Sequence, residues 1–319
     1  MDAPVALDRD GSAALYESAE VSWQKTKTCE VAYRRYGAGP PLLFLHGWPL
    51  TSFTFRRLLR FLIPHYTCYL IDVPGGGLTR WTKQTDFSWP GQALTIKELI
   101  DALLLKTYVI YGQDSGAMIA RSLAVIDGER MQRMIMTNTE MPGHRPPWIR
   151  LYRLSMFVPG TNFVMRLLLR SKRFLHSRFG FGNSFYHHAL IDEKWRQHVI
   201  EPLIKSARRM DGHNRFLRGW DWSLLDQMAD REHKQITEPV LMIWGENDPT
   251  FPVERAEEMV KQFPNAELRR VAKACVFVHE DQPQEVSRLI LEFLERGRLT
   301  EAKAATAVEA VATDPHRLP

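Results

Sequence analysis

Cysteine is scarce in this 319-residue sequence, and long apolar runs are missing from it. The three cysteines, Cys29, Cys68 and Cys275, follow neither a disulfide pattern nor a metal-ligand spacing, so we expect reduced thiols and a cytoplasmic location. No apolar stretch approaches the length that spans a bilayer. The first residues contain no basic segment followed by an apolar one, and internal repeats are absent. These absences favour a globular protein that is neither membrane-spanning nor secreted.

The residues that are present suit one large domain with a well-buried core. Hydrophobic residues make up 45% of the chain and aromatic residues 11%, which excludes a disordered protein. The net charge of +5 describes a long-range field and says nothing about the fold. No nucleic-acid-binding motif accompanies the cations, so we expect no nucleic-acid partner.

Many of the cations concentrate in one region of the chain. They are Arg145, Arg150, Arg153, Arg166, Arg170, Lys172, Arg173 and Arg178. Within that region, residues 162–179 interleave apolar side chains with cations, as an amphipathic helix does. We expect this helix to turn its apolar face inward and its arginines toward water. Binding of the basic helix to a membrane surface is the alternative.

Strand and helix signals alternate along most of the chain. A β-hairpin is predicted over residues 21–36, and buried strands are predicted at 42–45, 66–71, 107–111, 134–137, 240–244 and 268–271, with helices between them. This alternation is typical of an α/β fold with a mostly parallel, doubly wound sheet covered by helices. An aromatic, basic and largely helical block interrupts it. We therefore predict a core of residues 1–140 and 232–298 with residues 1–20 loose, a helical lid of residues 141–231, and a flexible tail of residues 299–319.

The most informative motif is the segment Gly112–Gly116, which carries Asp114 at its centre. A predicted strand precedes it and a predicted helix follows it, which is the context of a nucleophile elbow. Glycine at both ends permits a strained turn to pass close to its neighbours. A carboxylate at this position attacks saturated carbon and forms an alkyl ester, which makes carbon–halogen bonds and epoxides the natural substrates. An ordinary helix N-cap is the alternative role of Asp114.

The chain resembles α/β-hydrolases of the subgroup with an aspartate nucleophile, which includes haloalkane dehalogenases and epoxide hydrolases. Four motifs carry the resemblance in the expected order: Leu45–Pro49, Asp72–Gly77, the segment around Asp114, and Trp244–Pro249. The resemblance covers roughly residues 28–295. It implies the α/β-hydrolase fold, a hydrolase activity and no cofactor.

The resemblance also implies roles for several residues. The backbone N–H groups of Trp48 and Ser115 match those that form the anion hole, which stabilises an oxyanion or a departing halide. Asp248 matches the acid that orients the catalytic histidine. Glu140 is a second candidate for this acid, although Asn138 aligns better with that other position.

The catalytic histidine is where this chain departs from the family pattern. Val276 stands at its position, and valine cannot accept a proton. His279, three residues further on, serves as the base if the loop is rebuilt. Otherwise the activation of water is lost or assigned to another group, such as His144 at the lid entrance. Because ester hydrolysis needs a base and attack by Asp114 does not, the sequence predicts either an unusual hydrolase or a ligand-binding homologue.

The residues around the nucleophile and in the lid favour a small, neutral, apolar substrate. Ser115 and Met118 stand where fluoroacetate dehalogenases carry the arginines that hold a carboxylate. Candidate substrate contacts in the lid are His144, Trp148, Tyr152 and Tyr186, with Trp220 and Trp222 as further indole donors. The lid histidines His176, His187, His188 and His198 fit no metal-site spacing, so we expect no metal. We expect a monomer or a homodimer.

Overall fold

One mostly parallel sheet forms the centre of the computed structural model, which describes residues 11–230 and 232–296. Within these residues the sheet has nine strands in the order β1-β2-β4-β3-β6-β7-β8-β9, with β5 paired to β2. The strands are β1 (Ser22–Lys25), β2 (Cys29–Tyr36), β3 (Pro41–Leu45), β4 (Thr67–Ile71), β5 (Arg80–Trp81), β6 (Tyr108–Gln113), β7 (Met131–Thr137), β8 (Val240–Gly245) and β9 (Ala266–Val271). The strands β4, β3, β6, β7, β8 and β9 pair in parallel in this order, and every pair that includes β2 is antiparallel. The predicted α/β architecture is therefore confirmed.

Helices connect the strands and cover the sheet. Those of the core are α1 (Ser12–Glu17), α2 (Arg56–Leu62), α3 (Trp89–Ala102), α4 (Ser115–Asp127), α12 (Glu232–Gln235), α13 (Val253–Met259), α14 (Val278–Asp281) and a last helix over residues 283–296. Short 3-10 segments are η1 (Ser52–Phe55), η2 (Gly128–Arg130), η3 (His188–Leu190) and η5 (Val260–Gln262). All residues of β4, β6 and β8 are buried, as expected for parallel strands covered on both faces.

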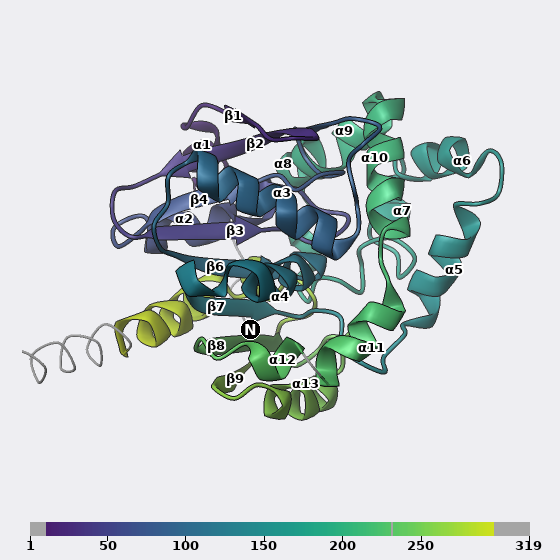
Figure 1. The fold of residues 1–319 in the computed structure, drawn as a ribbon. Coiled ribbons are helices and arrows are strands. Elements are labelled where there is room, and N and C mark those ends of the chain that lie inside the picture. Colours follow the sequence, from purple (N-terminus) through teal and green to yellow (C-terminus); the bar gives the residue numbers. More distant parts are fainter. Residues whose placement is uncertain (1–10, 231, 297–319) are drawn as a thin grey trace, which may run out of the picture.

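A helical insertion separates β7 from β8 in the chain. It contains α5 (Pro147–Ser155), α6 (Thr161–Leu168), α7 (Lys172–Leu175), α8 (Glu193–Trp195), the π-helical segment η4 (Arg196–Ile200), α9 (Glu201–Lys205), α10 (Ala207–Arg218) and α11 (Trp222–Asp230). Figure 1 shows α5, α6, α7 and α10 grouped together beside the sheet. Among the described residues, no helix combines the length and apolar character that crossing a bilayer requires.

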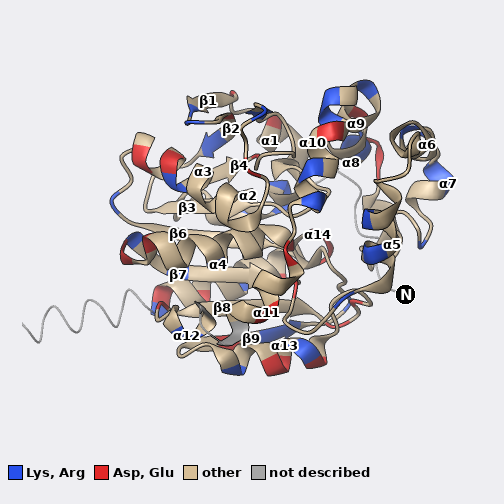
Figure 2. Ribbon diagram, turned by 45° about the vertical axis from the view of Figure 1, so that its right-hand side comes forward, with Lys and Arg blue, Asp and Glu red and all other residues tan. Residues whose placement is uncertain are grey.

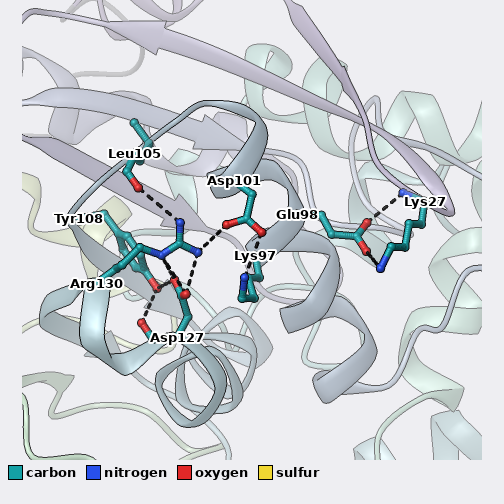
Figure 3. Close-up of polar contacts among 8 residues, drawn as sticks. All are labelled: Lys27, Lys97, Glu98, Asp101, Leu105, Tyr108, Asp127 and Arg130. Carbon is teal, nitrogen blue, oxygen red and sulfur yellow. Dashed lines mark hydrogen bonds and ion pairs between the residues drawn. The ribbon is translucent and has the colours of Figure 1, made fainter.

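A polar cluster fixes the start of β6, the strand that leads to Asp114 (Figure 3). The guanidinium of Arg130 donates to the carboxylates of Asp127 and Asp101, each over 2.7 Å. The hydroxyl of Tyr108, the first residue of β6, donates to Oδ2 of Asp127 over 2.9 Å. The same cluster ties Asp101 to Lys97 within α3. The amino end of β6 is thereby tied to α3 and α4.

Two segments differ from their expected structure. Residues 12–17, expected to be loose, form α1, and the hydroxyl of the buried Tyr16 is 2.9 Å from that of Ser52. The single amphipathic helix expected over residues 162–179 is two helices, α6 and α7. The apolar side of α6 is only partly turned inward, because Met165 packs against the core whereas Phe163 is 73% exposed. The guanidinium of Arg166 donates to the carbonyl of Ile204 instead of facing water. The predicted tail, residues 299–319, lies outside the described residues.

Candidate active site

Asp114 occupies a sharp turn between β6 and α4. Its backbone has φ 51° and ψ −132°, a conformation that is rare for a residue with a side chain. The turn lies very close to its neighbours, since a Cβ on Gly116 would stand 2.1 Å from the carbonyl oxygen of Leu45. A Cβ on Gly112 would stand 2.5 Å from Cα of Ala117. The two glycines therefore let the turn pack against β3 and α4, as a nucleophile elbow requires.

The carboxylate of Asp114 is held by the first residue of α4 and by the loop after β3. Its Oδ1 accepts from the backbone N–H of Ser115 over 2.6 Å and from the Ser115 hydroxyl over 2.8 Å. That hydroxyl in turn accepts from the backbone N–H of Trp48 over 2.9 Å. Gly47 permits this approach, because a Cβ there would be 2.3 Å from Cβ of Asp114. The structure thus brings Asp114, Ser115 and Trp48 together.

Asp114 also lines a cavity of about 370 Å³ between the sheet and the helical insertion. Most of the lining side chains are aliphatic or aromatic, and they include Trp48, Trp148, Leu151, Tyr152, Met165, Leu168, Leu169, Phe174, Phe179, Trp220, Val276 and Phe277. Among the described residues that line the cavity, Asp114 is the one carboxylate. Arg178 is the other charged residue of the lining, and a mostly apolar cavity with one carboxylate suits a small apolar ligand that the carboxylate attacks or binds.

Burial sets the protonation of Asp114. The pKa of its carboxyl lies well above the usual range, first because burial removes water from the charged form and second because Glu140 lies nearby. Hydrogen bonds from Ser115 and Trp48 act in the opposite direction. Burial also raises the pKa of Glu140 to about 7. The hydroxyl of Thr139 lies 2.9 Å from both the main-chain oxygen of Asp114 and Oε2 of Glu140. Glu140 is therefore an electrostatic neighbour of Asp114, although it does not line the cavity.

Asp248 lies in the turn after β8, and both of its carboxylate oxygens accept hydrogen bonds. Oδ1 accepts from the backbone N–H groups of Thr250 and Phe251, over 2.7 and 3.1 Å. Oδ2 accepts from the side-chain amide of Asn138 over 2.7 Å. Burial raises the pKa of Asp248 to about 7. Thr250 lines the cavity, so the Asp248 turn borders it.

Val276 lines the cavity with Asp114, but His279 does not. The imidazole of His279 is fully buried, and its Nε2 is hydrogen bonded to Oγ1 of Thr54 over 2.7 Å. The adjacent residue in α14, Glu280, accepts from the guanidinium of Arg56 over 2.6 Å, which anchors α14 in the core. Burial and the nearby arginines lower the pKa of His279 to about 3. The structure therefore does not bring His279 to Asp114, and we assign it no role as a base.

The expected substrate contacts divide into two groups. Tyr152, Trp148 and Trp220 line the cavity, and Nε1 of Trp220 has no hydrogen-bond partner among the described residues. His144 and Tyr186 do not line it. Nε2 of His144 lies 2.7 Å from the carbonyl oxygen of Thr250, and the backbone N–H of Tyr186 donates to Asp281. Trp222 contacts Trp220 edge to face behind the wall of the cavity.

His213 of α10 is a cavity residue that the sequence did not single out. Its ring lies 4.8 Å from the ring of Trp48, and its main-chain oxygen accepts from Nε1 of Trp48 over 3.1 Å. Burial lowers the pKa of its imidazole to about 3. The spacing of His213 from the apolar Met210 and Leu217 is the helical signal that could have indicated an inward-facing position.

The insertion histidines considered for a metal lie apart from the cavity. His198, for instance, contacts Glu17 over 2.9 Å and stacks on Phe53 at 4.0 Å. Within residues 11–230 and 232–296, no three His, Cys, Asp or Glu side chains are grouped to hold a metal ion.

Known proteins with similar sequences and structures share this fold. The model of the alpha/beta hydrolase fold family matches residues 40–283. Haloalkane dehalogenase 2 of Mycobacterium bovis is 25% identical over 275 residues, which cover 86% of this chain and 94% of that protein. Epoxide hydrolase 4 of Homo sapiens is 25% identical over 268 residues, which cover 80% of this chain and 72% of that protein. The solved structure of the epoxide hydrolase CorEH matches with a TM-score of 0.73 at 19% identity, over 87% of this chain and 99% of that one.

Proposed function

The chain belongs to the alpha/beta hydrolase fold family, and from this premise we propose that it is a hydrolase whose Asp114 carboxylate attacks a saturated carbon of a small apolar substrate. The observation that carries the proposal is the position of Asp114, on a strained turn at the wall of an apolar cavity. A serine nucleophile would form an acyl ester at a carbonyl carbon, whereas a carboxylate forms an alkyl ester by displacement.

The displacement accounts for the reactions named for two of the relatives, the haloalkane dehalogenase and the epoxide hydrolase. An oxygen of ionised Asp114 forms a bond to carbon while the carbon–halogen bond breaks, and the halide leaves with the electron pair. With an epoxide, the carbon–oxygen bond opens instead, and the ring oxygen takes a proton from a donor or from water. Both reactions end in the same alkyl ester on Asp114.

The negative charge on the leaving atom needs hydrogen-bond donors. Trp48 and Ser115 supply backbone N–H groups beside the carboxylate, and these form the proposed anion hole. For a halide, the Nε1–H of Trp220, which has no partner in the described part of the chain, is a further candidate donor. For an epoxide, the hydroxyl of Tyr152 is the candidate donor, and burial keeps it protonated by raising its pKa.

Release of the ester is the difficult step in this proposal. Water must be deprotonated to attack the ester, and Val276 at the cavity wall cannot do this. The carboxylate of Asp248 is already engaged by three hydrogen bonds. His213 shares the cavity, but an imidazole with a pKa near 3 is a weak base at neutral pH. We therefore expect the ester to form faster than it is hydrolysed.

Intact-protein mass spectrometry tests the proposal. The protein is incubated separately with 1-bromobutane and with styrene oxide and then weighed, and a peptide map locates any added group. We expect one alkyl group on Asp114 and none on the Asp114→Asn variant. A protein that neither gains mass nor releases alcohol, diol or bromide at neutral and alkaline pH would show that Asp114 is not a nucleophile for these substrates.

A further inference from the structure

The helical insertion presents an apolar face to solvent. Six of its exposed aliphatic and aromatic side chains form what we call the apolar face: Leu151, Leu154, Phe157, Phe163, Leu167 and Phe179. Phe163, Leu151 and Phe179 are 73%, 70% and 74% exposed. Single exposed apolar residues are ordinary on a protein surface, but a cluster on consecutive helices marks an interaction site.

The apolar face is continuous with the mouth of the cavity. Leu151 and Phe179 are exposed and also line the cavity that holds Asp114. Trp148 and Leu168 have the same two properties. Because α5, α6 and the segment after α7 all contribute such residues, they surround one opening. An apolar molecule that reaches this face therefore meets apolar side chains that also line the cavity.

The segment that carries the apolar face contains cations and no acidic residues. From residue 141 to residue 191 the sequence has eight arginines and lysines and no aspartate or glutamate. Since the whole chain has a net charge of +5, the rest of the chain is net negative. Figure 2 shows Lys and Arg but no Asp or Glu on α5, α6 and α7. Arg145 and Lys172 pair with Asp226 and Glu193, whereas among the described residues the exposed Arg150, Arg170, Arg173 and Arg178 have no carboxylate partner.

We propose that the apolar face docks the protein on the surface of an anionic lipid bilayer. The apolar side chains enter the interface, and the unpaired cations contact lipid headgroups. An apolar substrate dissolved in the bilayer then enters the cavity through its mouth. A second copy of the chain is a poorer occupant, because a two-fold contact through this face would place each copy's cations against the same cations of its partner.

Vesicle co-sedimentation tests the docking with the full chain. The vesicles contain either phosphatidylcholine alone or about 30% phosphatidylserine in phosphatidylcholine. Two variants alter the face: Arg170→Glu with Arg173→Glu, and Phe163→Ser with Leu167→Ser. The matched control is Leu104→Asn with Lys106→Glu, because these exposed residues precede β6 at its end opposite Asp114. Circular dichroism and thermal unfolding verify that each variant is folded.

We expect the wild type to bind the anionic vesicles, to bind less as salt rises, and to bind phosphatidylcholine weakly. Each cation near an anionic bilayer contributes roughly a fivefold gain in partitioning, so the arginine variant should lose at least about twentyfold. The serine variant should also bind more weakly, and the control should bind like the wild type. Retained salt dependence in the serine variant would show that the cations still act after the apolar contact is lost.

Three outcomes would overturn the docking. The first is a wild type that stays in solution with anionic vesicles at low salt. The second is an equal loss of binding in the control pair. The third is a dimer, measured by analytical ultracentrifugation, that dissociates on Phe163→Ser and Leu167→Ser and leaves no vesicle binding in the wild type. Because binding is measured without turnover, none of these outcomes bears on the chemistry of Asp114.

Discussion

Asn138 donates its side-chain amide to Oδ2 of Asp248 over 2.7 Å, and its own Oδ1 accepts from the backbone N–H of Gly245 over 3.0 Å. Asn138 follows β7 and Asp248 follows β8, so the contact joins the carboxyl ends of two neighbouring strands. With two backbone N–H groups on Oδ1, the carboxylate is satisfied without a histidine. Asp248, which we expected to orient a catalytic histidine, is therefore held in place without one.

A histidine in place of Val276 should supply the missing base and allow the alkyl ester on Asp114 to be hydrolysed. The backbone N–H of Asn247 donates to the carbonyl of Ala274 over 2.9 Å, which holds the loop of Val276 against the Asp248 turn. We expect Val276→His to increase release of alcohol or diol by about 10²–10⁴-fold, the usual contribution of a general base. Product is measured by gas chromatography with 1-bromobutane and styrene oxide. Val276→Asn is the control, because it adds a polar group without a base, and an equal gain in that variant would contradict the prediction.

Alkylation of Asp114 should become faster as pH rises. Only the ionised carboxylate attacks carbon, and burial and Glu140 hold the pKa of Asp114 well above its usual range. Glu140→Gln removes a neighbouring negative charge, so the pKa of Asp114 falls and the profile shifts to lower pH. The rate of adduct formation, measured by mass spectrometry between pH 5 and 9 (roughly the range over which these groups titrate), gives the midpoint. A midpoint that Glu140→Gln leaves in place would exclude this electrostatic coupling.

The same substitution should change the pH dependence of stability. The pKa of Glu140 is about 7 in the folded protein and about 4.3 in an unfolded chain, so the folded state binds the extra proton. Titration of Glu140 therefore does not change the free energy of unfolding below about pH 4, and it lowers this free energy increasingly as pH rises to about 7. Between pH 4.5 and pH 8, the free energy of unfolding of Glu140→Gln should increase relative to that of the wild type by on the order of 1–3 kcal/mol. Urea unfolding of both proteins at the two pH values measures this difference, and a constant difference would refute it.

A methyl group on Gly116 should damage the elbow. Its Cβ would stand 2.1 Å from a backbone oxygen of β3, and neither backbone can move without disturbing the sheet. We expect Gly116→Ala to lower the free energy of unfolding by about 3 kcal/mol or more, or to prevent folding. Gly128→Ala is the matched control, because the nearest atom there is the side-chain oxygen of Glu238 at 3.1 Å. Thermal unfolding of the two variants compares them, and equal stability would show that the turn is not close-packed.

Local patterns in the sequence predicted most of the core. The buried runs that become β3, β6 and β8 are short, apolar and bounded by turn residues, so each could be recognised without its neighbours. The start of a helix depends on its cap, as in α3, which begins at Trp89 because Ser88 precedes it and accepts from the N–H of Gly91. The position of the turn at Asp114 was predicted correctly, because Gly112 and Gly116 lie within two residues of Asp114 in the chain.

The sequence by itself determined the sheet, the turn that carries Asp114 and the absence of a histidine at position 276. These features depend on residue type and on spacing within a few residues. Only the tertiary structure decided that His279 lies in the core, that His213 lines the cavity and that α6 leaves much of its apolar side exposed. The amphipathic pattern of a helix reveals which side is apolar, but the neighbours that cover that side come from distant parts of the chain. For α6 these neighbours cover Met165 and leave Phe163 and Leu167 exposed, and this is the reason that the predicted orientation was only partly correct.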